Sequence, residues 1–308
     1  MKKKIIIGSR GSKLALIYAK KAKEELLKYL NDYNDEQIII KEIVTTGDEV
    51  KDKRLSDLGG KGLFSKNIEN ELIEKKIDIA IHALKDMESI ENKYLTIGAY
   101  IKRNDPRDIL VSSKIKRLSD LNKKVIVGSS SRRRELQLKL LNKNIKVENI
   151  RGNVDTRIKK VETGEFDGAI LALAGLKMLN LEKYAKEIFS IKDFIPTAGQ
   201  GIIAVQCRED DEYVRKVLKK INHKETEVCA LAERSFLKTL GGDCDTAVGC
   251  SAILNRDNIE INAQLFSDDG QKVFNVMKLG KSNQPQLLGK LAGEEILKKS
   301  GSNFIKKR

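Results

Sequence analysis

The stretch IIIGSRGS, residues 5–12, decides how the first half of this chain folds, and VIVGSSSRRR, residues 125–134, repeats its pattern in the second half. In each stretch a short run of β-branched residues ends at a glycine, and serines then begin a helix. A strand that hands over directly to a helix is typical of parallel sheets with crossover helices. The recurrence of this junction predicts two α/β units that are built alike.

Strands and helices alternate over the first two thirds of the sequence. Pro106 and Pro196 bracket the second half of this series. Because proline ends regular structure, these positions predict a middle domain inserted into the first, with a final strand that returns to the first sheet. The expected strands are residues 4–7, 37–44, 77–83, 94–101, 109–112, 124–127, 145–150, 168–173 and 201–207. One helix is expected to begin after Ser12 and another at Phe64, and two more are expected at residues 132–141 and 154–163.

The last third of the chain has a different character. A capping box at Asn222 and Glu225 is expected to begin a helix that stops at the glycine pair 241–242. Three strands without intervening helices and one final helix then predict a small α+β domain. These strands are expected at residues 248–254, 259–266 and 272–279, and the helix at residues 286–298.

The 308-residue chain is basic, because 59 Lys and Arg side chains outnumber 44 Asp and Glu and leave a formal net charge of +15. The length fits roughly two or three domains, and the charge indicates an anionic partner. Four cysteines without a C-x-x-C spacing, and only two histidines, predict neither a disulfide scaffold nor a metal site. No apolar run nears the ~18 residues of a membrane span or the length of a signal peptide, so a cytoplasmic protein without a membrane partner is expected.

Both strand-to-helix junctions place small residues and arginines at a helix N-terminus, where free N–H groups and the helix dipole favour an anion. Neither junction is a G-x-G-x-x-G or Walker sequence, so no nucleotide is implied. Lys61, Arg151 and Arg157 stand near the starts of two other expected helices. Because arginine suits planar carboxylates and phosphates, this clustering predicts a ligand with several such groups; capping serines beside solvated arginines are the alternative.

Asp86 follows the apolar strand expected at residues 77–83. An acid at the carboxyl end of a buried strand, among basic groups, suits proton transfer or stabilisation of a cation. The alternative is an aspartate that caps the next turn and pairs with Lys85. His82, four residues earlier, is expected to form a structural hydrogen bond.

Cys244 is the one cysteine on an expected glycine-flanked loop. An exposed thiol can act as a nucleophile or a covalent anchor, and an incidental cysteine is the alternative. Asp243 and Asp245 disfavour its thiolate, which argues against a fast nucleophile but permits a single attachment to a strong electrophile. The other three cysteines fall in apolar segments that predict core packing: Cys207, Cys229 and Cys250.

Taken together, these segments resemble the porphobilinogen deaminase family, whose members are also called hydroxymethylbilane synthases. The matching motifs cover nearly the whole chain in the family's order. They are residues 8–10 (GSR), 59–64 (GGKGLF), 82–86 (HALKD), 103–108 (RNDPRD), the serine–arginine run at 129–134, residues 151–154 (RGNV), 173–177 (LAGLK), 199–201 (GQG) and the Cys244 loop.

The resemblance implies an α/β fold of two periplasmic-binding-protein-like domains of type II and a small C-terminal α+β domain. The implied bounds are residues 1–101 with 200–219, residues 102–199, and residues 220–308. It also implies a monomeric, cytoplasmic transferase of porphyrin and haem biosynthesis. Such an enzyme condenses four porphobilinogen molecules head to tail, with loss of ammonia, onto a covalent dipyrromethane primer, and then releases the linear tetrapyrrole hydroxymethylbilane by hydrolysis.

By the same resemblance, Asp86 is the catalytic residue and Cys244 carries the dipyrromethane cofactor through a thioether. The residues implied to bind the cofactor are Lys85, Asp86, Ser129, Ser130, Ser131, Arg133, Arg134 and Arg151, and those implied to bind substrate are Arg10, Ser12, Lys61, Phe64, Arg151, Arg157 and Gln200. No metal is implied. The residues suit this chemistry, because each pyrrole brings two carboxylates for the arginines, and a carboxylate stabilises the cation left when ammonia departs.

The sequence departs from the usual family pattern in ways that bear on rate and chain-length control. Many members have serine, a valine–proline pair, arginine, glycine and proline where this chain has Ala83, Met87 with Glu88, Met178, Asp243 and Ala247. A non-catalytic two-lobed anion-binding protein is the main alternative, although it explains neither Asp86 nor Cys244. A nucleic-acid-binding protein rests on net charge alone, since the sequence has no helix-turn-helix or RNA-binding signature.

Overall fold

The computed structural model describes residues 4–30, 33–49, 62, 64–241, 246–267 and 269–301, so Lys61 and Cys244 lie outside the described residues. The chain divides into two compact units, Met1–Asn104 with Ile202–Ala230 and Asp105–Gly201 with Leu231–Arg308. The division into three domains stays a prediction.

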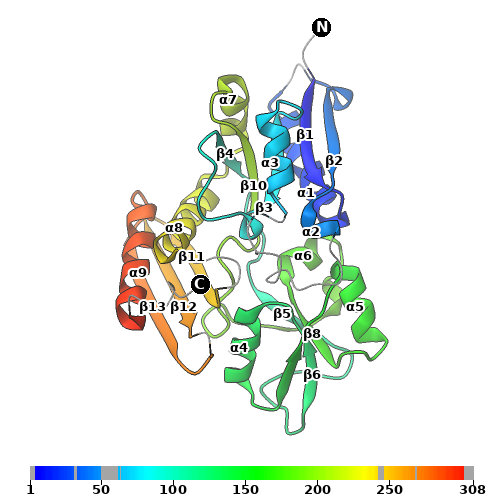
Figure 1. The fold of residues 1–308 in the computed structure, drawn as a ribbon, viewed down its shortest axis with the longest axis vertical. Helices are drawn as coiled ribbons and strands as arrows, with labels where there is room; N and C mark the ends of the chain where they lie inside the picture. Colours follow the sequence, from blue (N-terminus) through cyan, green and yellow to red (C-terminus); the bar gives the residue numbers. More distant parts are fainter. Residues whose placement is uncertain are drawn as a thin grey trace. The chain divides into compact units, whose positions relative to one another are not determined.

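The first unit is built on a five-stranded sheet. Its strands are β1 (Ile5–Arg10), β2 (Ile38–Ile43), β3 (Ile79–Ala83), β4 (Leu95–Tyr100) and β10 (Ile203–Arg208). They lie in the order β2-β1-β3-β10-β4, as Figure 1 shows. β1 is parallel to β2 and β3, whereas β10 is antiparallel to β3 and β4. The return of β10 to the first sheet confirms the prediction from Pro106 and Pro196.

The helices of the first unit begin where short polar side chains can cap them. α1 (Lys13–Leu27) follows Ser12, whose side chain accepts a hydrogen bond from the N–H of Ala15, as the sequence predicts. α2 (Thr46–Glu49) and α3 (Lys66–Ile73) precede β3. α7 (Glu212–Ile221) was not predicted, although Asp211 caps it and four buried residues recur at helical spacing: Val214, Val217, Leu218 and Ile221.

The second unit repeats the sheet of the first. Its strands are β5 (Asp108–Val111), β6 (Val125–Gly128), β7 (Ile145–Glu148), β8 (Gly168–Ala172) and β9 (Ala185–Ile188), in the order β7-β6-β8-β5-β9. β6 is parallel to β7 and β8, and β5 is antiparallel to β8 and β9. At one end of each sheet the edge strand pairs in parallel with the strand that precedes it in the sequence, β2 with β1 and β7 with β6. At the other end an antiparallel strand, β10 or β5, lies next to the edge strand. This common order confirms the predicted pair of α/β units that are built alike.

Helices cover both faces of this second sheet. α4 (Arg132–Leu141) has the predicted bounds, and α5 (Val154–Glu162) and α6 (Leu173–Met178) follow. Along β5, Ile109 and Val111 pack in one apolar cluster with Ile158 of α5, while Leu110 packs in another with Leu138 of α4. The apolar strands are thus buried on both sides, as a mostly parallel sheet requires.

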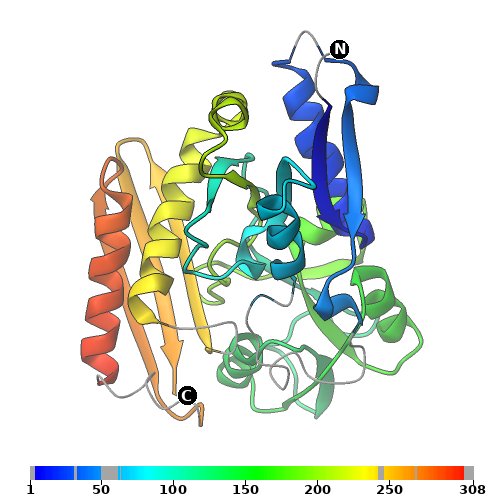
Figure 2. The ribbon, with the colours of Figure 1, turned by 45° about the horizontal axis from the view of Figure 1, so that its top comes forward.

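The predicted C-terminal α+β part is confirmed. The antiparallel strands β11 (Val248–Asn255), β12 (Asn258–Phe266) and β13 (Val273–Lys281) form a separate sheet. α8 (Lys224–Leu240) and α9 (Pro285–Ser300) lie side by side in Figure 2. They approach closely because Gly289 has no side chain: a Cβ there would lie 2.1 Å from the carbonyl oxygen of Ala232.

The predicted capping box at the start of α8 is wrong. The Asn222 side chain accepts a hydrogen bond from the N–H of Tyr100 instead, at 2.9 Å. His223 takes the capping place, with its Nδ1 3.3 Å from the N–H of Thr226. The spacing of Asn222 and Glu225 predicted a hydrogen bond within the first turn of the helix. The Asn222 side chain accepts instead from the end of β4, which is distant in sequence.

In each of the two five-stranded sheets, an aspartate just before one strand forms the same pair of hydrogen bonds with the backbone of the neighbouring strand. Asp78, just before β3, donates its N–H to the carbonyl of Ile6 and accepts the N–H of Ile6 on its side chain, at 2.8 and 3.0 Å. Asp167, just before β8, makes the same two bonds with Ile126, at 2.9 and 2.8 Å. Asp78 also faces the buried guanidinium of Arg208 at 3.2 Å.

Replacement of these two aspartates by alanine is expected to destabilise the protein to different degrees. Asp167→Ala leaves the Ile126 N–H without its acceptor, which costs about 1–3 kcal/mol of the free energy of unfolding. Asp78→Ala loses the same bond and also weakens the pairing of a buried cation, so its loss is expected to be larger. Urea unfolding of both variants measures the difference, and an equal or smaller loss in Asp78→Ala would contradict the contribution of Arg208.

Candidate functional site

The first junction holds Arg10 against an aromatic ring. Arg10 is the last residue of β1, and its guanidinium lies 3.9 Å from the centroid of the Phe64 ring. The ring lies directly over Gly47, where a Cβ would be 2.3 Å from the Phe64 Cε1 atom. The absence of a side chain at Gly47 therefore lets Phe64 support Arg10 in a cation–π contact. Lys61, predicted to join them, lies outside the described residues.

Asp86 ends a 3₁₀ turn, Leu84–Asp86, that follows β3 directly. Its side chain is half-buried, and among the described residues it forms no hydrogen bond or ion pair. The alternative in which Asp86 pairs with Lys85 is therefore not what the structure shows. The carboxylate stands at the carboxyl end of a buried strand with its charge available to a ligand.

Tyr18 of α1 interacts electrostatically with Asp86, and no sequence motif singles it out. Burial, reinforced by the negative charge of Asp86, raises the pKa of Tyr18 well above its ordinary value. The phenol therefore stays protonated and uncharged.

His82 is a structural residue, as expected. Its Nε2 lies 3.1 Å from Oε1 of Gln206, and the Gln206 amide nitrogen donates to Glu69 at 3.1 Å. The amide oxygen of Gln206 thus faces the imidazole, so His82 donates from Nε2–H. Burial lowers the pKa of His82 to about 4, although the hydrogen bond to Gln206 opposes this shift.

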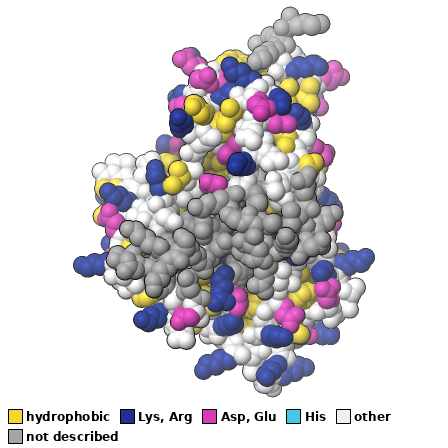
Figure 3. All heavy atoms as spheres, in the orientation of Figure 1, with side chains coloured by type: hydrophobic (Ala, Val, Ile, Leu, Met, Phe, Trp, Pro, Cys, Tyr) yellow, Lys and Arg dark blue, Asp and Glu magenta, His cyan; other side chains and the backbone are white. Residues whose placement is uncertain are grey.

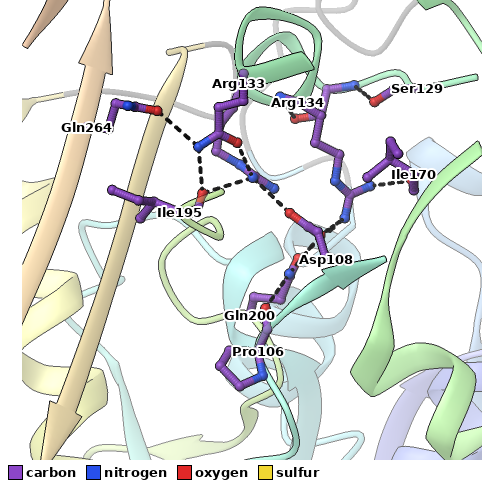
Figure 4. A network of polar contacts seen from close by, with 11 residues as sticks. Pro106, Asp108, Ser129, Arg133, Arg134, Ile170, Ile195, Gln200 and Gln264 are labelled. Atoms are coloured by element: carbon purple, nitrogen blue, oxygen red, sulfur yellow. Dashed lines mark hydrogen bonds and ion pairs between the residues drawn. The ribbon is translucent and has the colours of Figure 1, made fainter. Parts of the chain in front are cut away.

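The second unit gathers a polar network around Asp108, the first residue of β5 (Figure 4). One carboxylate oxygen of Asp108 accepts from Arg133 Nη1 at 2.8 Å, and the other accepts from Arg134 Nη2 at 2.6 Å. Gln200 donates to the same carboxylate at 2.9 Å. Asp108 is completely buried, and Arg133 and Arg134 are only 4% and 8% exposed. The predicted arginine pair is thus part of a buried network and not a solvated surface.

The two guanidiniums make further bonds to the backbone. Arg133 Nη1 also donates to the carbonyl of Ile195 and to Gln137, both at 2.9 Å, and Arg134 Nη1 donates to the carbonyl of Ile170 at 3.0 Å. The Nε atoms of both arginines are buried and donate to no residue in the described part of the chain. These two N–H groups are therefore unsatisfied within the described part of the chain.

The predicted serine hydroxyls shape the turn between β6 and α4. Ser131 caps α4 by accepting from the N–H of Arg134 at 3.4 Å, and Ser129 accepts from the N–H of Ser131 at 3.2 Å. Ser130 donates to the carbonyl of Ile150 at 2.6 Å. Each hydroxyl already has a local partner, so these serines fix the direction of the arginines that follow them.

Arg151 and Arg157 flank the start of α5, and both are half-buried. Arg157 Nε donates to the carbonyl of Gly152 at 2.8 Å, and Gly152 has a φ of +108° that favours glycine. These two arginines belong to the same unit as Arg133 and Arg134. Their predicted roles in ligand binding stay predictions.

The predicted anchor Cys244 lies outside the described residues, but the elements on both sides of it are described. α8 ends four residues before it at Leu240, and β11 begins four residues after it at Val248. Glu233 of α8, completely buried, accepts the N–H of Ala252 in β11 at 2.7 Å. The other three cysteines are buried, as the sequence predicts: Cys207, Cys229 and Cys250.

Among the described residues, no three or more His, Cys, Asp or Glu side chains are grouped as a metal ion would need. None of the described helices is long and apolar enough to cross a membrane.

Two family descriptions match the chain. "Porphobilinogen deaminase, dipyromethane cofactor binding domain" matches residues 5–216, and "Porphobilinogen deaminase, C-terminal domain" matches residues 227–298. Relatives named porphobilinogen deaminase include one from Alkaliphilus metalliredigens, 41% identical over 98% of this chain and 94% of its own length. Another, from Coxiella burnetii, is 37% identical over 99% of this chain and 98% of its own.

More distant similarity extends to solved solute-binding proteins. A TRAP periplasmic solute binding protein from Desulfovibrio salexigens is 12% identical, with a TM-score of 0.43 over 72% of this chain and 73% of its own. The methionine binding protein MetQ is 12% identical, with a TM-score of 0.44 over 70% of this chain and 88% of its own.

The buried neutral imidazole of His82 makes stability depend on pH. Its folded pKa of about 4 lies below the ordinary value of 6.5, so the unfolded chain takes up a proton first as the pH falls. The stabilisation is therefore present above pH 6.5 and is lost as the pH falls toward 4. Between pH 7 and pH 5 this group is expected to remove about 2 kcal/mol from the free energy of unfolding. Urea unfolding at both pH values measures the drop in the free energy of unfolding, which should be smaller by this amount in His82→Gln than in the wild type. A drop of equal size in the two proteins would exclude a buried neutral His82.

Proposed function

The chain belongs to the porphobilinogen deaminase family, and on that premise we propose how its own residues carry out the family's reaction. The protein is a transferase, a hydroxymethylbilane synthase of porphyrin biosynthesis with a dipyrromethane cofactor. It condenses porphobilinogen, with loss of ammonia, into a linear tetrapyrrole. The observation that carries this conclusion is the match of both family descriptions, in order, over residues 5–216 and 227–298.

The residues of the second unit fit the cofactor. A dipyrromethane of this kind bears acetate and propionate carboxylates, which accept hydrogen bonds and carry negative charge. Arg133 and Arg134 have buried Nε donors without an acceptor among the described residues. We assign these two arginines, with Arg151, to the cofactor's carboxylates, since guanidinium and carboxylate pair in a planar fork. When bound, the group supplies the pyrrole carbon to which the first substrate is joined.

The serines and Cys244 complete this assignment. Ser129, Ser130 and Ser131 set the turn that aims the arginines, and the N–H groups at the start of α4 add positive dipole charge. Cys244 is the proposed thioether anchor. Its place between α8 and β11, which Glu233 ties together, gives such an anchor a firm base.

Asp86 is the proposed catalytic residue of the first unit. Loss of ammonia from porphobilinogen leaves positive charge on the substrate, and a carboxylate held in place stabilises that charge better than water does. Asp86 suits this task because no hydrogen bond or ion pair within the described residues neutralises it. The carboxylate can also take a proton from the pyrrole ring when the new bond forms. Lys85 beside it is proposed to bind the cofactor.

Arg10, Ser12 and Phe64 are proposed to bind substrate in the first unit, and Lys61 with them. The Phe64 ring holds the Arg10 guanidinium in place, so the cation presents a fixed donor edge to a substrate carboxylate. Arg157 and Gln200 are the proposed substrate contacts of the second unit. The amide nitrogen of Gln200 already donates to Asp108 and to the carbonyl of Pro106, which fixes the side chain in place.

Several departures from the family pattern lie on either side of Asp86 in the sequence. Ala83 ends β3, and Met87 after Asp86 is buried in an apolar cluster with Leu84. Met178 ends α6, where it offers no charge to a substrate carboxylate.

We further propose a cytoplasmic monomer without a nucleic-acid or membrane partner. On the described part of the face in Figure 3, Lys and Arg side chains are scattered among Asp and Glu and do not form a stripe. A polyanion such as nucleic acid is favoured by a continuous basic surface. The three-domain division, with bounds 1–101 and 200–219, 102–199 and 220–308, is part of the same proposal.

The covalent anchor is tested by intact mass. Chain purified from cells that make porphobilinogen should carry an adduct of two linked pyrrole units, because a thioether survives denaturation whereas a non-covalent ligand is lost. Cys244→Ala should lack the adduct, whereas Cys250→Ala, which alters a buried cysteine, should keep it. Unmodified wild-type chain, or an adduct that persists in Cys244→Ala, would disprove the anchor.

Asp86→Asn is expected to fold as the wild type does and to lose nearly all turnover. Removal of one charged catalytic group typically lowers kcat by about 10²–10⁴-fold. Asp210→Asn, which makes the same change at an exposed position of the first unit, should leave kcat unchanged. The measurement is the initial rate of porphobilinogen consumption, and a rate near wild type in Asp86→Asn would remove Asp86 from the mechanism.

A further inference from the structure

Asp108 is a buried acid to which neither motif nor family resemblance assigns a role in the reaction. We propose that it is a positioning residue, whose carboxylate holds Arg133 and Arg134 in the orientation that receives the cofactor's carboxylates. This inference rests on the proposed cofactor-binding role of the two arginines.

The geometry makes Asp108 the common partner of both cations. Its two carboxylate oxygens are divided between them, one for Arg133 at 2.8 Å and one for Arg134 at 2.6 Å. Among the described residues, neither arginine forms an ion pair with another acid. The two guanidiniums are adjacent in sequence in the first turn of α4 and are both buried, so they would repel each other without this carboxylate.

Asp108 leaves one donor edge of Arg133 unused. All three hydrogen bonds of the Arg133 guanidinium leave from Nη1, to Asp108, Gln137 and the carbonyl of Ile195. The Nε and Nη2 groups, which form a parallel pair of donors, bind no residue of the described ranges. Such an edge is the one that a carboxylate matches with two hydrogen bonds. Asp108 therefore holds the guanidinium from the Nη1 side, and the proposal assigns the Nε–Nη2 side to a carboxylate of the cofactor.

The charge balance points the same way. Two guanidiniums against one carboxylate leave a single net positive charge in the network. Although burial opposes it, the two guanidiniums hold the pKa of Asp108 below its ordinary range, so the carboxylate stays ionised. One further anionic group would complete the balance, and a carboxylate of the cofactor supplies it.

The same network is connected to both sides of the Cys244 segment. Gln200, which donates to Asp108, follows Gly199, whose N–H is accepted by Glu233 of α8 at 2.6 Å. The second oxygen of Glu233 accepts the N–H of Ala252 in β11. Asp108 thus orients the arginines relative to the two elements that lead into and out of the proposed anchor, which a purely local ion pair would not do.

The test is a change of carboxylate position without a change of charge. Asp108→Glu keeps the buried anion but moves it by roughly 1.5 Å, one carbon–carbon bond. The fraction of chain that carries the two-pyrrole adduct is measured by intact mass, and thermal unfolding is measured on the same samples. If Asp108 positions the arginines, the loaded fraction of Asp108→Glu should fall by about tenfold or more, as it does when supporting partners of a ligand site are displaced.

Asp78→Glu is the matched control, because Asp78 is also a buried acid paired with a buried arginine, Arg208, but lies in the first unit. It should lower the unfolding temperature and load within about twofold of wild type, since no proposed cofactor ligand depends on it. Normal loading of Asp108→Glu, or an equal loss of loading in Asp78→Glu, would overturn the positioning role.

Measurement of the wild-type chain distinguishes a failure of the proposed function from a failure of this inference alone. If wild-type chain carries no adduct, the proposed function fails, whereas a loaded wild type beside a loaded Asp108→Glu refutes only the inference. If Asp108→Glu does not unfold cooperatively, Asp108→Asn takes its place, because it keeps the length of the side chain and removes only the charge that faces the two arginines. Slower adduct formation in that variant on incubation with porphobilinogen supports the inference, and a wild-type rate overturns it.

Discussion

The second unit depends on one constraint, which is that two buried guanidiniums share a single carboxylate as their counter-ion. A buried guanidinium without a counter-ion is far more costly than a missing hydrogen bond, and here two of them begin the same helix. Asp108 can serve both only if the start of β5 is held close to the first turn of α4. The sheet provides this: β5 lies between β8 and β9, and Asp108 is paired in register with Ala172. The strand order therefore positions Asp108 for the two arginines as well as forming the core.

The two aspartates at the proposed sites show how surroundings divide one residue type between two duties. Asp108 is completely buried and satisfied by three side chains, so it can only hold its neighbours. Asp86 is half-buried on a short turn, with no partner of its own among the described side chains and a protonated Tyr18 nearby. An acid with such freedom can respond to charge that develops on a substrate. Catalysis needs the second kind of acid and positioning needs the first.

Local signals predicted much of this fold, and distant contacts explain what they missed. The bounds of α4 and the Ser12 cap of α1 follow from spacing within one turn of chain, and both are as predicted. The capping box at Asn222 was wrong because the N–H of Tyr100, 122 positions away, competes for the same side chain. The burial of Arg133 could not be predicted for a similar reason: its partners are Asp108 and Ile195, 25 and 62 positions away. A run of serines and arginines shows that cations are present, but not which acid meets them.

The net charge of +15 is therefore a poor guide to what the protein binds. What a ligand meets is the charge that remains after internal pairing, and around Asp108 that is one positive charge from two arginines. A site with both charges exposed would hold a dicarboxylate tightly and release it slowly. Partial neutralisation weakens each contact while the directional N–H groups keep its geometry. This suits the proposed role of the two arginines, because a thioether to Cys244 would hold the cofactor covalently and the arginines then need only orient its carboxylates.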